Sequence, residues 1–219
     1  MKKAFITAAI LVLLTNNAFA FNFHFFGKTH VDKFTNDSRF NNNRVNTLTN
    51  DSGFSKNNIN ELTNDYTIKA ALNMLQTNGE GEVLNSLSKM HVKLMFYDFS
   101  KMGMSGNYYA MKAKQGRQLY IVINRRYKNS PTEAIACLIA HESVHKLPKP
   151  TFDEEVAATT EEAQCWTSLK KDNSYSSKDA LINRLNDLSA LYLASTPGND
   201  LIKDKIANSS FYRNQLAMK

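Results

Sequence analysis

The segment His141-Glu142-Ser143-Val144-His145 constrains the fold of this chain more than any other feature. It is an H-E-x-x-H pattern at the end of an apolar run, and the pattern requires a helix. Residues four apart lie on one face of a helix, so His141 and His145 can point two imidazoles at one metal ion, most often zinc. Glu142 then stands beside the metal, where a general base would act. The chain holds five histidines, which makes an accidental match the less favoured interpretation.

The sequence around the motif supplies the helix. Ser130 is predicted as its N-cap, Pro131 as its first residue and Glu133 as the partner in a capping box. Residues 134–140 are apolar on all sides, which is typical of a buried helix. Two prolines within 146–150 end it. We therefore expect both histidines in the last turns of a core helix.

The remaining pattern predicts short strands before this helix and helices after it, which favours an α+β domain. Strands are expected at 91–99, 108–112 and 118–124. Helices are expected at 67–76, 82–91, 152–166, 177–194 and within 199–208.

The motif, with strands before it and a helix after it, resembles the zincin metallopeptidases over about residues 92–169. The resemblance implies a small sheet whose edge strand follows the cleft, then the motif helix, then a second helix that brings the third metal ligand. We therefore expect a zincin-like metallopeptidase domain over residues 67–219.

The third ligand distinguishes the branches of that family. Pro148 and Thr151 stand where the metzincin pattern has Gly and His, so that branch is excluded. The resemblance then points to a compact gluzincin-like branch, in which a glutamate on the following helix binds the metal.

Helical phase ranks the glutamates of that following helix. At 100° per residue, Glu155 lies at the border of the apolar stripe, and Glu162 follows on the same side two turns later. Glu154 and Glu161 fall on the opposite side and are expected in solvent. We predict Glu155 as the ligand, with Glu154 and Glu162 as the alternatives, and Glu162 as the group that orients a ligand histidine. The stripe is predicted to contain Phe152, Val156, Thr159, Ala163 and Trp166.

These residues indicate an exported Zn²⁺-dependent metallopeptidase that hydrolyses peptides or proteins, with Glu142 as general base. Tyr192 and Tyr212 are candidates for the oxyanion donor, and the strand at 119–124 is a candidate to bind substrate backbone. The alternative is a non-catalytic envelope or surface binding protein, with a structural metal site and an N-terminal arm as its functional part.

Residues 1–20 are typical of a secretory signal peptide, with a basic start, a short apolar run and Ala18-Phe19-Ala20 at the end. We expect export to a bacterial periplasm or medium and no membrane span in the mature chain. Removing Lys2 and Lys3 lowers the formal charge from +7 to +5. The Lys and Arg residues form no dense run, so no nucleic-acid partner is expected.

An Asn-rich segment at 21–66 separates the signal from the domain. Fourteen-residue units begin at Val31, Val45 and Ile59, and each carries Thr-Asn-Asp between apolar positions. A polar linker is favoured, with a pro-segment or a binding arm as alternatives.

The chain contains two cysteines, Cys137 and Cys165, each in a predicted helix near the metal motif. In an oxidising compartment they could form a disulfide. Two buried free thiols are the equally weighted alternative.

Overall fold

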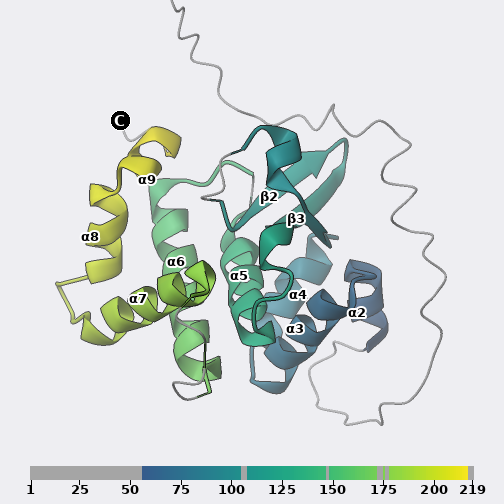
Figure 1. Cartoon of the computed structure of the whole chain (residues 1–219), viewed down its shortest axis with the longest axis horizontal. Coiled ribbons are helices and arrows are strands. Elements are labelled where there is room, and N and C mark those ends of the chain that lie inside the picture. The colour runs from purple at the N-terminus through teal and green to yellow at the C-terminus, as the bar shows by residue number, and fades with distance from the viewer. Residues whose placement is uncertain (1–55, 105–107, 147, 172–174, 176–177, 217–219) are drawn as a thin grey trace, which may run out of the picture.

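The computed structural model describes residues 56–104, 108–146, 148–171, 175 and 178–216. The expected signal peptide, the first repeat unit and the second unit up to residue 55 lie outside these residues. The fold is α+β, as predicted, with a small mixed sheet among many helices (Figure 1). In chain order the elements are α2 (Lys56–Leu62), α3 (Tyr66–Thr77), α4 (Gly81–Lys89), β1 (Lys93–Tyr97), η1 (Phe99–Met102), β2 (Ala110–Gln115), β3 (Gln118–Asn124), η2 (Arg125–Tyr127), α5 (Thr132–Val144), α6 (Phe152–Leu169), α7 (Ala180–Ala194), α8 (Leu201–Asn208) and α9 (Ser210–Gln215).

The sheet has the strand order β1-β3-β2, with β3 parallel to β1 and antiparallel to β2. A two-residue loop joins β2 to β3, and its Gly116 has φ 58°, a conformation that favours glycine. Since both sides of β3 are already hydrogen-bonded, the prediction that residues 119–124 receive a substrate strand is wrong. The edges of the sheet are β1 and β2.

The two faces of the sheet follow the alternation of β3. Ile121 and Ile123 pack into the main core with the helices, whereas Val122 packs on the other face with Phe99 and Ala113. Lys112 on β2 lies opposite Ile121 in the register. Its side chain therefore points to the helix-covered face, where it is buried.

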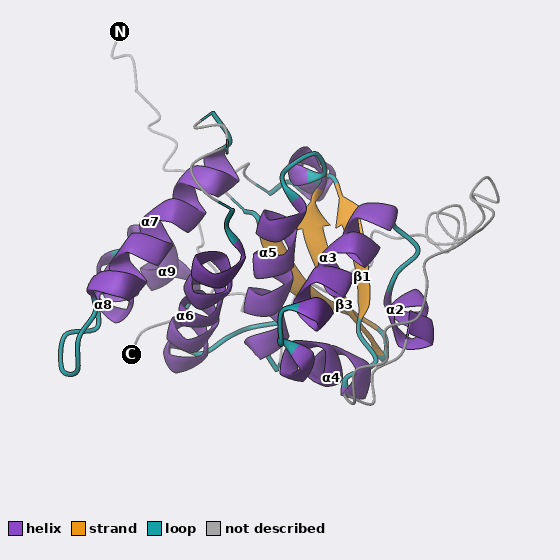
Figure 2. Ribbon diagram, turned by 90° about the horizontal axis from the view of Figure 1, so that it is seen from below, coloured by secondary structure: helices purple, strands orange, loops and turns teal. Residues whose placement is uncertain are grey.

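Helix α5 lies in the centre of the molecule, between α6 on one side and α3 with the sheet on the other (Figures 1 and 2). Residues 134–140 are all buried, because apolar side chains surround this part of the helix. The buried helix thus holds the motif at its C-terminal end in a fixed position.

The ends of α5 differ from the prediction. Its N-cap is Pro131, without a side-chain hydrogen bond, because the Ser130 hydroxyl donates to Oδ2 of Asp179 at 2.7 Å. Glu133 pairs with Lys171 at 3.3 Å and forms no capping box. The last helical residue is Val144, and His145 follows it with extended backbone angles.

The C-terminal helices cover α6. The helix predicted from residue 177 begins at Ala180, where Oδ1 of Asp179 accepts from the first backbone N–H groups. Sequence reasoning did not predict α9. Its Tyr212 packs beside a second core cluster that α6, α7 and α8 share.

The third repeat unit contributes to the core. Ile59, Leu62 and Ile68 are buried, and Thr63 accepts a hydrogen bond from the backbone of Asp65. The Asp65 carboxylate in turn caps α3. The segment expected to be a linker as far as residue 66 therefore packs with the domain from Ile59 onward.

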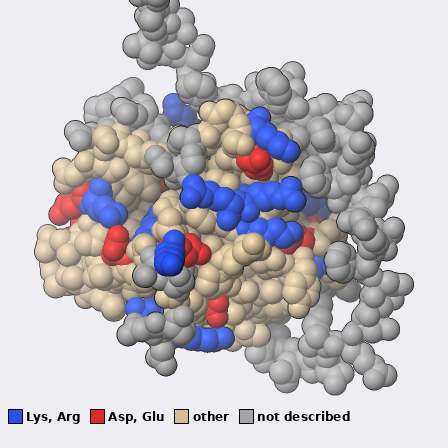
Figure 3. Space-filling view, viewed as in Figure 1, with Lys and Arg blue, Asp and Glu red and all other residues tan. Residues whose placement is uncertain are grey.

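The surface is mixed in charge. Figure 3 shows Lys and Arg side chains gathered in a band across the middle of one face. Among the described helices, none combines the length and the apolar character that a bilayer crossing needs.

Candidate metal centre

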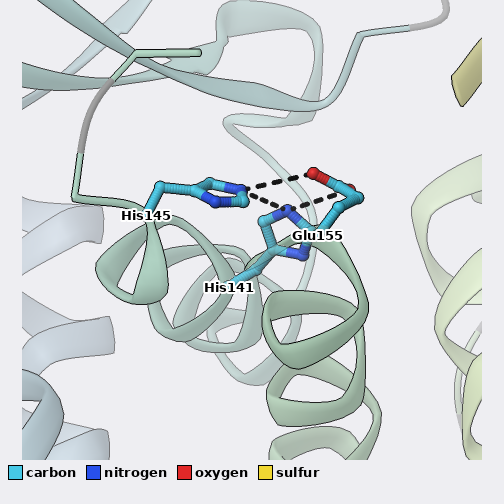
Figure 4. A group of neighbouring side chains, drawn as sticks. All are labelled: His141, His145 and Glu155. Carbon is cyan, nitrogen blue, oxygen red and sulfur yellow. Dashed lines mark hydrogen bonds and ion pairs between the residues drawn. The ribbon is translucent and has the colours of Figure 1, made fainter. Parts of the chain in front are cut away.

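The ligand atoms of His141, His145 and Glu155 converge between the end of α5 and the first turns of α6 (Figure 4). The Nε2 atoms of the two histidines are 3.2 Å apart. Oε1 of Glu155 lies 3.6 Å from Nε2 of His141, and its Oε2 lies 3.5 Å from Nε2 of His145. The structure therefore brings together the three residues that the sequence selected.

These distances fit a tetrahedral metal site. Ligand atoms about 2.0–2.1 Å from zinc stand about 3.3–3.5 Å from one another when the angles are tetrahedral. The two histidine nitrogens are 3.2 Å apart, and each of the two Glu155 oxygens lies 3.5–3.6 Å from one of these nitrogens. Two imidazole nitrogens and one carboxylate oxygen also suit a divalent transition metal, so the residues present can hold such an ion.

The ligands belong to a ladder of contacts between α5 and α6. Cys137 and His141 on α5 and His145 at its C-cap follow one another at intervals of four. They face Cys165, Glu162 and Glu155 in turn on α6. The sharp link between the helices holds this alignment, because both oxygens of Glu154 accept from backbone N–H groups there, those of Lys146 and Thr151.

Burial keeps both histidines neutral at physiological pH. Desolvation lowers the pKa of His141 to about 4 and that of His145 to about 3. The Glu155 carboxylate opposes the shift at His141 but does not overcome it. Neutral imidazoles are the form that binds a metal ion, so the site is prepared for one.

Glu142 is buried one residue along the helix from the first ligand. Desolvation, followed by the neighbouring Glu155, raises its pKa to about 8. The backbone N–H of Lys112 donates to its carboxylate, and its Oε2 has no hydrogen-bond partner within the described part of the chain. A carboxyl group of this pKa can accept and release a proton near neutral pH.

The other glutamates of α6 have separate positions. Oε2 of Glu162 lies 3.0 Å from Nδ1 of His141, and the side chain is fully buried. Glu154 forms a capping box with Thr151, and it is not part of the ligand cluster. Glu161 was expected in solvent but is half-buried, and burial raises its pKa.

The buried stripe of α6 is rotated by roughly a quarter turn from the predicted one. Phe152 and Val156 are only half-buried, against the second core cluster. Glu155 and Glu162 therefore stand near the middle of the buried face rather than at its border. The rotation follows from packing α6 against both α5 and the C-terminal helices. The buried residues of α6 are Glu155, Ala158, Thr159, Glu162, Ala163, Cys165, Trp166 and Leu169.

The two cysteines are neighbours, with 2.6 Å between their Sγ atoms, and both are buried thiols. Burial holds the pKa of Cys137 well above its usual value. The structure thus places the predicted pair in contact in its reduced form.

Sequence reasoning missed two cations of the site. Arg184 on α7 forms an ion pair with Glu162 and hydrogen-bonds to Tyr212. Lys112 on β2 donates to the carbonyl of His145. A usable signal existed for Arg184, because it stands between Leu181 and Leu188 on the apolar stripe of its helix.

One of the two tyrosine candidates reaches the site. The Tyr212 hydroxyl hydrogen-bonds to Glu155 and Arg184, and burial raises its pKa to about 12. Tyr192 packs against the second core cluster instead. The cluster of ligands is therefore enclosed by residues of α5, α6, α7, α9 and β2.

Fold and cluster together define the chain as a helix-rich α+β protein with a buried group of side chains that could hold a metal ion. Comparison with protein-family models, with curated proteins and with solved structures finds no match.

Proposed function

We propose that this protein is a zinc-dependent peptidase, exported through the signal pattern of residues 1–20. The observation that carries the proposal is the buried group of His141, His145 and Glu155 with the Glu142 carboxyl beside it. Two neutral imidazoles and one carboxylate are a ligand set of catalytic zinc sites, which use three protein ligands and leave a fourth position open.

Charge supports a bound divalent ion. Three buried carboxylates, Glu142, Glu155 and Glu162, gather around two cations, Lys112 and Arg184. With neutral histidines the described residues of the site sum to two minus two, or zero, while Glu142 holds its proton, as its pKa of about 8 favours at neutral pH, and to three minus two, or one, negative charge when Glu142 is ionised. Uncompensated charge in a protein interior is costly, and a cation at the ligand cluster removes that cost.

In the proposed reaction, His141, His145 and Glu155 would hold a metal ion, which when bound would supply a Lewis acid for the scissile carbonyl and a water of lowered pKa. Glu142 accepts the proton of the attacking water at its carboxylate and then gives it to the leaving amine. The Lys112 backbone N–H holds that carboxylate by a hydrogen bond. Of the two tyrosine candidates for the oxyanion donor, Tyr212 is the one whose hydroxyl lies beside the ligand cluster, next to Glu155.

An extended peptide suits the neighbouring strand. The edge strand β2 contributes Lys112 to the site and is paired only with β3 in the described sheet. A substrate added beside β2 would pass the ligand cluster with its backbone hydrogen-bonded to the strand. We therefore assign the substrate strand to β2 in place of residues 119–124.

A Glu142→Gln variant tests the proposal. It keeps the ligand set, so it should bind zinc like the wild type, and it should lose hydrolysis of an unfolded protein substrate such as casein. A Glu154→Gln variant is the matched control, because Gln can keep the capping box. Full hydrolysis by Glu142→Gln would contradict the mechanism. Zinc held by four protein ligands, without turnover, would favour the structural alternative.

A further inference from the structure

We propose that Arg184 is the positioning residue of this centre, because its guanidinium orients His141 through Glu162 and Glu155 through Tyr212. The inference rests on the proposed metal site and extends it to residues outside α5 and α6. It begins from the unusual place of Arg184, a cation on the inward-facing side of α7 whose side chain is only 19% exposed.

Arg184 reaches the ligands through two chains of contacts, here called arms, and the first arm runs through Glu162 to His141. One oxygen of this fully buried carboxylate pairs with Nη1 of Arg184, and the other lies 3.0 Å from Nδ1 of His141. The two atoms are within ion-pair distance but are not aligned as a hydrogen bond, since neither has a hydrogen-bond partner among the described residues. A carboxylate this close to Nδ1 still favours the tautomer with the proton on that nitrogen, which leaves the lone pair of Nε2 for a metal ion. Without Arg184 the Glu162 carboxylate would be buried without its ion-pair partner.

The second arm runs through Tyr212. The guanidinium donates to the Tyr212 hydroxyl, and that hydroxyl donates to the carboxylate of Glu155. The hydrogen bond limits rotation of the ligand carboxylate, whose two oxygens lie 3.6 and 3.5 Å from the two histidines. One side chain thus acts on two of the three ligands.

His145 lies outside this network. Among the described residues its carboxylate contact is Glu155 at Nε2, no carboxylate pairs with its Nδ1 as Glu162 does with that of His141, and Lys112 donates to its backbone carbonyl. The asymmetry makes the proposal specific: loss of Arg184 should disturb His141 and Glu155 and leave His145 unchanged.

Only arginine suits this position. A guanidinium has five N–H donors in a planar fork, so it can serve a carboxylate and a hydroxyl together. Its plane also packs over the ring of Tyr109, 5.0 Å from the centroid, which fixes its direction. A lysine would keep the charge but not this double contact.

The test compares Arg184→Met, Arg184→Lys and Arg126→Met in the full chain. Arg126 is a matched control, since it is exposed and its guanidinium also lies over a ring, that of Tyr127 at 5.1 Å. Affinity for Zn²⁺ alone is measured by competition with a chelator. We expect Arg184→Met to weaken it 10- to 100-fold, Arg184→Lys less, and Arg126→Met not at all.

A second readout separates positioning from a merely structural role. In the metal-free protein, ¹⁵N NMR should place the proton of His141 on Nδ1 in the wild type and distribute it over both nitrogens in Arg184→Met. Glu162→Gln and Tyr212→Phe each cut one arm, so each should weaken Zn²⁺ binding less than Arg184→Met does.

The outcomes are distinct. Unchanged Zn²⁺ affinity and an unchanged His141 tautomer in the Arg184 variants would overturn the inference and leave the proposed function intact. If Arg184→Met does not fold, Arg184→Lys decides by the same two measurements. If the wild type binds no Zn²⁺, the proposed function fails, and the tautomer of His141 alone decides the role of Arg184.

Discussion

Replacing Glu142 by glutamine should stabilise the metal-free protein at alkaline pH, although it abolishes the proposed reaction. The folded state raises the pKa of this carboxyl from its usual 4.5 to about 8. A raised pKa means that the folded protein holds the proton more tightly than the unfolded chain does. The contribution of this group to stability is therefore present below pH 4.5 and is lost as the pH rises to 8.

The magnitude follows from the size of the shift. Each pKa unit corresponds to about 1.4 kcal/mol, so a rise from 4.5 to about 8 costs up to about 5 kcal/mol once the group is ionised. Relaxation of the site lowers this value, and about 3 kcal/mol between pH 5 and pH 8 is a reasonable expectation. A domain of this size shifts its Tm by about 2–4 °C per kcal/mol, which gives roughly 10 °C.

The assay is thermal unfolding of the chelator-treated wild type and Glu142→Gln, followed by circular dichroism from pH 5 to pH 8. The lowered pKa values of His141 and His145 remove stability from both proteins as the pH falls below 6.5. That contribution cancels in the difference between the two proteins. The Tm difference should grow with pH. A difference that stays constant from pH 5 to pH 8 would refute the buried-carboxyl argument.

Three further outcomes are expected. The protein with Zn²⁺ at 1,000 times Kd should have a free energy of unfolding about 4 kcal/mol higher than the chelator-treated protein. This difference should be smaller in Glu155→Gln and unchanged in Glu154→Gln. Oxidised glutathione should convert the thiols of Cys137 and Cys165, 2.6 Å apart, to a disulfide, seen as the loss of two hydrogens by mass spectrometry and as a gain of about 3–4 kcal/mol in the free energy of unfolding by denaturant. Cys165→Ser is the control. Two thiols that can still be alkylated after oxidation would contradict the prediction. Asp179→Ala should destabilise the protein by about 2 kcal/mol because it removes both the α7 cap and the Ser130 contact, whereas Ser130→Ala should cost less by the same measurement; equal losses would show that the cap contributes nothing.

Local sequence signals predicted much of the fold and the centre of the site. The spacing of His141 and His145 belongs to one helix, and the ranking of Glu155 over Glu154 follows from one helical phase. Both features depend on residues a few positions apart in the chain, so they can be predicted from one sequence. The strand at 118–124 was predicted at its observed bounds because β-branched residues and alternation are also local.

The errors have a common cause in long-range contacts. Ser130 looked like a cap, but Asp179, far along the chain, takes its hydroxyl. The order of the strands in the sheet depends on which strands pair with each other, and the sequence of β3 alone does not contain that information. Arg184 and Tyr212 reach the site only because α7 and α9 fold back over α6. Helical phase placed Glu155 on the right side but missed the burial that a second packing partner adds.

The short link between α5 and α6 has a consequence for the order of folding. Two of the three proposed ligands, His145 and Glu155, are ten residues apart in sequence, so closing the loop between them has a small entropic cost. The α5–α6 pair can therefore bind an ion while α7 and α9 are still undocked. An ion that binds such a partly folded chain stabilises the native state by less than its affinity for the native state would suggest. Folding in the presence of metal is then expected to show two phases: rapid capture of the ion by the helical pair, and slower docking of the helices that bring Arg184 and Tyr212.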